Sequence, residues 1–281
     1  MYTRPNNNKT VMRWVVGPAV LFMVVVAYLA IHGSDQVNPP GQPVGLRPAG
    51  PDNPVPVKNP IDELLKPPAG VTPRDGVAAA ILIDVSGSMG DRVKDAQGAL
   101  KSKIDIAKKC LLSLVNQTDR FTKGHPDRGI LLGIYEFSGL DGRDSCRRVI
   151  PLGKADPATA AAALARMSPN GNTPIGNAIL RVKRDLDATG MKRQHILVIT
   201  DGENNSGYSV PDVVSAMGRQ SEENRASVYL IAFDVAEAKF APVREAGAMV
   251  LAASNENELQ TTADYILTGK ILAEQPETPK K

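Results

Sequence analysis

The sequence has few aromatic residues and little excess of either charge. Only 4% of its 281 residues are aromatic, and 33 Lys and Arg stand against 30 Asp and Glu. No basic run carries the interleaved aromatic residues that nucleic-acid-binding segments use. The composition therefore argues against a nucleic-acid-binding protein.

The motifs of common enzyme classes are also missing. The sequence has no Walker loop, no G-x-S-x-G and no recognised Ser–His–Asp order. Its 3 histidines, His32, His125 and His195, do not have the spacing of a zinc site. We therefore expect a protein that is not an enzyme.

A short polar segment follows the apolar run at residues 77–83: Asp-Val-Ser-Gly-Ser at residues 84–88. The run is typical of a buried strand, so a carboxylate and two hydroxyls lie on a tight turn at its carboxyl end. Gly87 lacks a Cβ, which lets the turn aim both hydroxyls at one point. Open α/β sheets bind ligands at this end, and Mg²⁺ prefers oxygen ligands. The segment favours a metal site; the alternative is a turn in which Asp84 caps a following helix.

Two later segments add oxygen donors. The apolar residues 196–200 read as a second buried strand, which ends at Asp201 and Gly202. Thr173 and Pro174 open a segment with apolar residues at helical spacing, where Thr173 suits the N-cap and Pro174 the first helical position. Taken alone, Thr173 could be only a cap and Asp201 only a turn residue.

These segments together resemble a known family. D-V-S-G-S-M at residues 84–89, G-N-T-P at 171–174 and I-T-D-G at 199–202 are similar to the metal-ion-dependent adhesion site of von Willebrand factor type A (VWA) domains. The resemblance covers about residues 75–271. It implies an Mg²⁺ or Mn²⁺ site whose ligands are Asp84, Ser86, Ser88, Thr173 and Asp201, the last often acting through a water.

The resemblance also implies a partner. In the family, a carboxylate from a partner protein often completes the metal's coordination. The residues next to the predicted ligands are then candidates to contact that partner: Gly87, Met89, Asn172, Gly202 and Glu203. Glu203, like Asn204 and Asn205, could instead be a solvated turn residue.

Residues 14–31 form an uncharged apolar run close to the length that spans a bilayer. Arg4, Lys9 and Arg13 precede it, and the first basic residue after it is Arg47, so the positive-inside rule keeps the N-terminus in the cytoplasm. A cleaved signal peptide is the competing interpretation. We expect a single-pass anchor in a bacterial cell membrane, with the C-terminal domain periplasmic or extracellular.

The chain therefore divides into a cytoplasmic segment (1–13), the anchor (14–31), a tether (32–74), a VWA-like domain (75–272) and a polar tail (273–281). Half of the 22 prolines lie between residues 34 and 73, so the tether is expected to be extended and disordered. Residues 61–65 interrupt it with apolar side chains. They could form a helical turn that docks on the domain or a solvated turn.

Strands alternate with helices along the domain, which predicts an α/β fold: a doubly wound, mainly parallel sheet with helices on both faces and one antiparallel edge strand, preceded by the transmembrane helix. Residues 129–137 and 146–150 are the expected edge pair. A helix is expected from about residue 92, with residues 121–128 as a long surface connection after it. The remaining expected elements are helices at 158–167, 211–221 (capped by Ser209) and 256–272, and strands at 227–233 and 248–252.

The two cysteines, Cys110 and Cys146, are expected to be separate thiols, although export would permit a disulfide. Our first functional hypothesis is a membrane-anchored module that binds a protein through a divalent metal. The alternatives are an accessory or assembly subunit of a membrane complex and a Mg²⁺-dependent hydrolase, in which Asp201 is the only candidate base.

Overall fold

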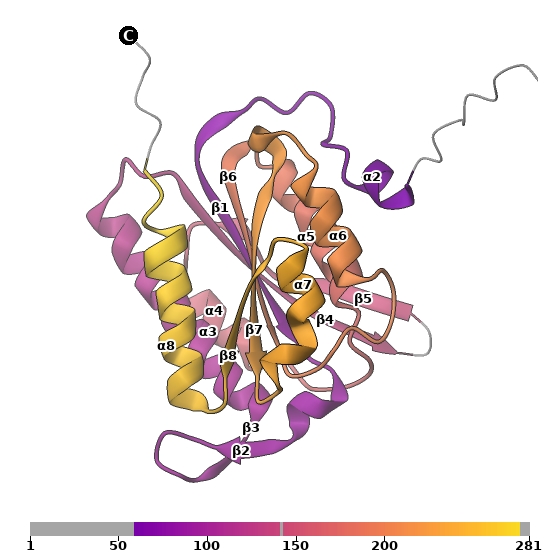
Figure 1. Cartoon of the computed structure of the whole chain (residues 1–281). Coiled ribbons are helices and arrows are strands. Elements are labelled where there is room, and N and C mark those ends of the chain that lie inside the picture. Colours follow the sequence, from indigo (N-terminus) through magenta and orange to yellow (C-terminus); the bar gives the residue numbers. More distant parts are fainter. Residues whose placement is uncertain (1–58, 141–142, 276–281) are drawn as a thin grey trace, which may run out of the picture. The chain divides into compact units, whose positions relative to one another are not determined.

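The computed structural model describes residues 59–140 and 143–275 (Figure 1). The predicted anchor and most of the predicted tether lie outside these residues. Within the described residues, no helix combines the length and the apolar character needed to cross a membrane.

Six strands form the central sheet in the order β5-β4-β1-β6-β7-β8. All neighbouring pairs are parallel except the edge pair β4–β5, which is antiparallel. This confirms the predicted sheet with one antiparallel edge strand. The strand bounds are β1 Arg74–Asp84, β4 Ile130–Leu140, β5 Arg143–Gly153, β6 Met191–Thr200, β7 Ala226–Phe233 and β8 Met249–Ala253.

Helices cover both faces of this sheet (Figure 1). One face carries α3 (Lys103–Gly124), α4 (Pro157–Leu164) and α8 (Glu256–Ile266), which continues into a π turn (Leu267–Ile271). The other carries α2 (Pro60–Leu64), α5 (Ile175–Asp187), α6 (Val210–Gly218) and α7 (Ala241–Glu245). Short 3₁₀ turns complete the described elements: Gly87–Gly90, Glu222–Asn224 and Glu237–Phe240.

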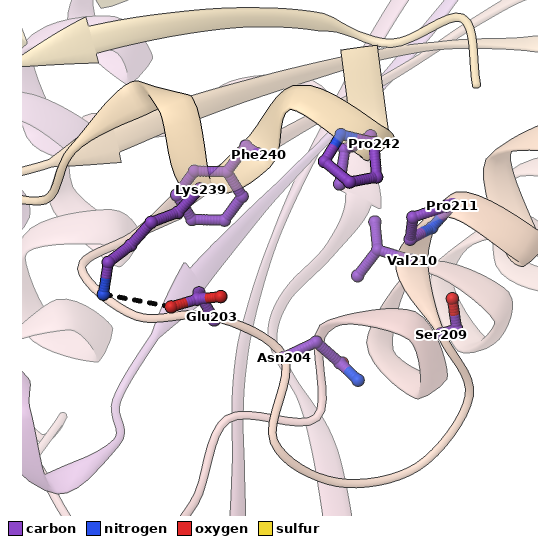
Figure 2. Close-up of a pocket in the computed structure, with 9 residues that line it drawn as sticks. Glu203, Asn204, Ser209, Val210, Pro211, Lys239, Phe240 and Pro242 are labelled. Carbon is purple, nitrogen blue, oxygen red and sulfur yellow. Dashed lines mark ion pairs between the residues drawn. The ribbon is translucent and has the colours of Figure 1, made fainter. Parts of the chain in front are cut away.

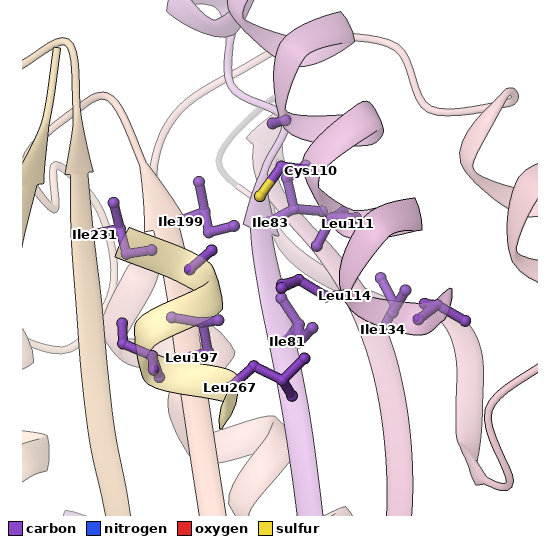
Figure 3. Packing of buried hydrophobic residues seen from close by; sticks show 14 of the residues in the cluster. Ile81, Ile83, Cys110, Leu111, Leu114, Ile134, Leu197, Ile199, Ile231 and Leu267 are labelled. Carbon is purple, nitrogen blue, oxygen red and sulfur yellow. The ribbon is translucent and has the colours of Figure 1, made fainter. Parts of the chain in front are cut away.

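Two hydrophobic cores result, one on each side of the sheet, because successive strand side chains point to opposite faces. Ile81 and Ile83 of β1 pack with Leu111 and Leu114 of α3 on the first side (Figure 3). Cys110 is buried in this first core, whereas Cys146 packs against the second, and both are free thiols. The prediction of two separate thiols is confirmed.

The helix expected from about residue 92 begins later. Residues 92–102 form a hairpin of β2 (Arg92–Lys94) and β3 (Leu100–Ser102), and α3 starts at Lys103 behind the N-cap Ser102. The hairpin turn forms because Asp95 Oδ1 accepts the N–H groups of Gln97 and Ala99, at 2.9 and 2.8 Å, and because Gly98 adopts φ +81°. These local bonds replace the first turns of the predicted helix.

Three other boundaries differ from the expectations. Helix α3 runs to Gly124, so the predicted long connection at residues 121–128 is helical in its first half. Helix α5 begins at Ile175, which leaves Thr173 and Pro174 just before it. His195 lies inside β6 rather than before a strand, and its ring is buried.

Residues 61–65 form a helical turn that docks on the domain, which was one of the two structures considered for this segment. Ile61 and Leu65 are buried in the second core, where α2 contacts α6. Gln220 Nε2 donates to the carbonyl of Leu65 at 2.8 Å, and Arg219 pairs with Asp62. The chain is therefore fixed to the domain well before β1 begins.

Candidate functional site

The site lies where the sheet changes its winding direction. Strands β1 and β6 are parallel neighbours, with Ile83 opposite Ile199. The chain leaves β1 toward β4 on one side and leaves β6 toward β7 on the other. In open α/β sheets the ligand crevice lies at such a point, outside the carboxyl ends of the two strands. Asp84 is the last residue of β1, and Asp201 directly follows β6. Both predicted carboxylates therefore enter one crevice.

Asp84 is held by two donors. Its Oδ1 accepts the N–H of Ser86 at 2.7 Å, and its Oδ2 accepts the hydroxyl of Thr200 at 2.6 Å. Burial of the fully enclosed carboxyl raises the pKa of Asp84 to about 6. The hydrogen bonds from Thr200 and Ser86 act to lower this pKa, and the like charge of Asp201 acts to raise it. An unneutralised buried carboxylate of this kind favours a nearby cation.

Ser86 and Ser88 lie on the first loop, which follows β1, and their hydroxyls join Asp84 to the third loop, which follows β6. Ser86 Oγ and Ser88 Oγ are 3.2 Å apart, and Ser88 Oγ donates to Asp201 Oδ1 at 2.7 Å. Ser86 is buried, whereas Ser88 is exposed. Four of the five predicted metal ligands thus belong to one hydrogen-bonded cluster that opens to the surface at Ser88.

Thr173 lies on the second loop, which precedes α5, and is held against the third loop by Asn205. Its N–H donates to Asn205 Oδ1 at 2.8 Å, and its carbonyl accepts the N–H of Asn205 at 3.1 Å. A Cβ built on Gly202 would lie 3.5 Å from Thr173 Oγ1, which places this buried hydroxyl against the third loop. The first loop is tied in as well, because Gly87 N–H donates to the carbonyl of Gly171 at 3.0 Å.

Lys103, which the sequence analysis did not single out, reaches the same crevice. Its Nζ lies 3.0 Å from Asp201 Oδ2 and 3.0 Å from Asp234 Oδ2, and only 8% of its side chain is exposed. Burial alone would lower the pKa of Lys103, but its bonds to the two carboxylates outweigh burial and raise it. A signal was present in the sequence, because Lys103 has the helical spacing of buried Ala107, Cys110 and Leu114.

Three more polar residues position the loops. Thr200, hidden at the end of an apolar strand, bonds Asp84 and also accepts the N–H of Gly202 at 3.2 Å. Asn204 Oδ1 accepts the N–H of Gly176 at 3.0 Å, and Asn205 holds Thr173. Asn204 and Asn205 therefore connect the third loop to the start of α5. The sequence had suggested only that they contact a partner or form a solvated turn.

The residues predicted to contact a partner differ in accessibility. Gly87, Asn172 and Glu203 are exposed, and Gly202 is half-buried. Met89 is 0% exposed and belongs to the first hydrophobic core, because the 3₁₀ turn directs its side chain inward. Met89 is thus a core residue beneath the loop, and the interpretation of it as a contact residue is not supported.

A small cavity lies beside the third loop (Figure 2). Its volume is about 180 Å³, and Glu203 pairs with Lys239 at its rim at 3.0 Å. Its apolar wall includes Val210, Phe240 and Pro242. Ligand pockets for small molecules usually enclose about 300–1,000 Å³, so this cavity is too small for such a ligand.

The donor chemistry of the crevice fits a hard divalent cation. Two carboxylates and three hydroxyls lie on its three loops, and oxygen-only ligand sets suit Mg²⁺ and Mn²⁺. The described residues contain no group of three or more His, Cys, Asp and Glu side chains placed to hold a metal. Because three of its five oxygen donors are hydroxyls, the crevice is a candidate for a hydroxyl-rich cation site.

Comparison with known proteins agrees with the fold. A family model described as "von Willebrand factor type A domain" matches residues 79–203, whereas none of the curated proteins matches the sequence. BatB from Bacteroides thetaiotaomicron is 21% identical, with 71% of this chain and 100% of that chain covered and a TM-score of 0.53.

Two further structures have comparable scores. The PilB minor pilin from Streptococcus sanguinis is 15% identical, with 74% of this chain and 63% of that chain covered and a TM-score of 0.54. The vWF domain of the type V pili tip protein Mfa5 from Porphyromonas gingivalis is 12% identical, with 72% and 98% covered and a TM-score of 0.51. This chain thus spans less than two thirds of PilB.

At these identities the structural likeness is one of fold alone. The matched family model spans all three loops of the candidate site, from β1 to Glu203. The match to the von Willebrand factor type A model covers less than half of the chain, residues 79–203, and the structures compared are similar to this chain in fold.

Proposed function

We propose that this protein binds another protein through a divalent metal ion held in the crevice between β1 and β6. The observation that carries the proposal is the single oxygen cluster that joins Asp84, Ser86, Ser88 and Asp201 and opens to the surface at Ser88. Two of the proteins with a similar fold are, by their names, a minor pilin and a pili tip protein.

Each site residue has a role in this proposal. Asp84, Ser86, Ser88 and Thr173 would hold Mg²⁺ or Mn²⁺, and Asp201 would support them from the third loop. A bound dication supplies an electropositive position that attracts an anion. Three of these four ligands are neutral hydroxyls and Asp84 is the charged one, which leaves part of the metal's charge for an acidic side chain of the partner.

A hydrolytic role has less support. Asp201 is the only candidate base, but Ser88 donates to one of its oxygens and Lys103 to the other. A carboxylate that already accepts two hydrogen bonds is a poor acceptor for a substrate proton. We therefore propose a protein that is not an enzyme, with an accessory role in a membrane complex as the second candidate.

We also propose that residues 14–31 anchor the chain in a bacterial cell membrane, with the N-terminus in the cytoplasm and the domain periplasmic or extracellular. The uncharged run and the basic residues before it support this topology. A reporter that is active only outside the cytoplasm, fused after Lys281, is expected to be active. A cytoplasmic signal would contradict the topology and favour the accessory role.

The binding function is tested by capture of partners from cross-linked membranes with the full chain, in Mg²⁺ or in EDTA. The matched variants are Asp84→Ala and Asp156→Ala, because Asp156 only caps α4. A partner retained with Mg²⁺ by the wild type and Asp156→Ala, and lost with EDTA or Asp84→Ala, is the expected result. A partner retained by a folded Asp84→Ala variant in EDTA would contradict it.

A further inference from the structure

Lys103 is an unusual residue for the floor of a cation site. It begins α3, its side chain is 8% exposed, and it lies 3.0 Å from the carboxylate of Asp201. A buried ammonium needs compensating charge, and here that charge belongs to a predicted metal ligand. The same ammonium also binds Asp234, at the carboxyl end of β7.

Each carboxylate oxygen of Asp201 accepts a hydrogen bond from a side chain of the protein. Ser88 donates to its Oδ1 at 2.7 Å and Lys103 to its Oδ2 at 3.0 Å. A carboxylate with both oxygens bound by the protein's own donors is restrained from moving into direct contact with a cation. Lys103 therefore holds Asp201 in position, and its positive charge offsets the negative charge of Asp201 next to the cation site.

The charges of the buried groups can be added. Asp84 and Asp201 contribute two negative charges and Lys103 one positive charge, whereas Asp234 is 40% exposed and is screened by water. A dication added to these three groups leaves one positive charge in the crevice. Without Lys103 the same sum is zero. One carboxylate from a partner would restore neutrality only when Lys103 is present.

We infer that Lys103 is a positioning residue that sets the charge of the site, weakening the binding of the dication and strengthening the binding of a single carboxylate from the partner. The inference rests on the proposed function, because it assumes a cation in the crevice. The inference predicts opposite changes in the affinity for Mg²⁺ and in the affinity for the partner's carboxylate when Lys103 is replaced. A lysine that only held the loops in place would lower both affinities when removed.

The test uses the full chain and its Lys103→Met variant, which keeps the length of the side chain and removes its charge. Mg²⁺ affinity is measured by calorimetry, and acetate affinity of the Mg²⁺-loaded protein by chemical-shift titration. Lys101→Met is the control, because Lys101 loses the same charge two residues away, where it is 48% exposed and pairs with Asp95. Cooperative melting in EDTA establishes that each variant is folded.

We expect Lys103→Met to bind Mg²⁺ about tenfold more tightly and acetate about tenfold more weakly than the wild type, with Lys101→Met within about twofold for both. Equal or weaker Mg²⁺ binding by folded Lys103→Met overturns the inference. Mg²⁺ binding by Lys103→Met alone supports the inference and contradicts the proposed function. Absence of Mg²⁺ binding by both proteins contradicts both.

If Lys103→Met does not fold, the same two affinities are measured for Asp234→Asn instead. Asp234 has φ 53°, a conformation that Asn tolerates, and its loss removes a negative charge next to Lys103. The expected changes then have opposite signs: weaker Mg²⁺ binding and stronger acetate binding. Stronger Mg²⁺ binding by Asp234→Asn overturns the inference.

Discussion

Thr200 is the side chain on which the geometry of Asp84 most depends. Its hydroxyl donates to Asp84 Oδ2 at 2.6 Å and accepts the N–H of Gly202, so one atom links the ends of β1 and β6. Groups that orient metal ligands in this way commonly change metal affinity when they are replaced. Thr200 therefore belongs to the functional unit although it contributes no predicted metal ligand.

Replacement of Thr200 by Val keeps the shape of the side chain and removes the hydroxyl. We expect Thr200→Val to weaken Mg²⁺ binding about 10-fold or more, because Asp84 loses a donor that orients it. The matched control is Thr118→Val, where an equally buried hydroxyl donates to Leu114 within α3. Calorimetric titration with Mg²⁺ checks both variants, and equal losses of affinity would show a general effect on stability.

The sequence predicts the candidate metal ligands better than it predicts the residues that hold those ligands in place. Carboxylates and hydroxyls just after apolar runs identify Asp84, Ser86, Ser88 and Asp201, which the structure brings together. Thr200 escapes notice because a Thr at the end of a buried strand fits β-propensity alone. Nothing local to the motif shows that Met89 turns into the core.

The second loop is an element placed by backbone contacts. Gly139 of β4 and Asn172 exchange two backbone hydrogen bonds, at 3.0 and 2.6 Å. Gly171 lies between this bridge and the first loop, with φ +84°, and a Cβ on it would come within 2.0 Å of the carbonyl oxygen of Gly139. Only glycine lets the loop carrying Thr173 lie this close to β4.

Gly171→Ala is expected to lower the free energy of unfolding by more than the cost of positive φ alone, about 1–3 kcal/mol, and to weaken Mg²⁺ binding. Gly98→Ala separates the two effects. Gly98 has nearly the same φ, +81°, but no atom lies within 4 Å of the Cβ position. Urea unfolding and Mg²⁺ titration compare them. Equal destabilisation, with no loss of Mg²⁺ affinity, would show that the contact with Gly139 does not place the loop.

The strands that are buried on both faces were predicted well from the sequence, because their residues form long apolar runs. Strands β1, β6 and β7 lie inside a sheet covered on both faces, so their residues form nearly continuous apolar runs. The β2–β3 hairpin has three-residue strands outside that sheet, and its Leu100 is exposed, so no periodic pattern marks it. Its turn is encoded instead by Asp95 and Gly98, whose bonds are local.

The whole domain carries two buried titratable groups with opposite effects on stability. Burial raises the pKa of Asp84 from 3.8 to about 6, and burial together with Arg193 lowers the pKa of His195 from 6.5 to about 4. His195 lies in β6, with its Nδ1 3.3 Å from the hydroxyl of Tyr229 and its Nε2 3.7 Å from Glu274. Both groups titrate in the same pH range.

Their contributions are expected to cancel between about pH 4 and 6 in the absence of metal, where the two pKa shifts overlap. In that range the folded state holds a proton on Asp84 that the unfolded state releases, so this carboxyl lowers stability as the pH rises. The unfolded state holds a proton on His195 that the folded state excludes, so this ring raises stability as the pH rises. Each term amounts to about 3 kcal/mol at about 1.4 kcal/mol per pKa unit.

Removing one group should therefore expose the other. In EDTA between about pH 4.5 and 6, we expect the free energy of unfolding to rise with pH in Asp84→Asn, to fall in His195→Asn and to stay nearly constant in the wild type. The shifted carboxyls of Asp95, Asp156, Glu256 and Glu258 have lowered pKa values, so they titrate below this range. Urea unfolding at each pH measures the three slopes. Slopes of the same sign in both variants would mean that the carboxyl of Asp84 is not the group that opposes His195, and that burial does not raise its pKa as the structure implies.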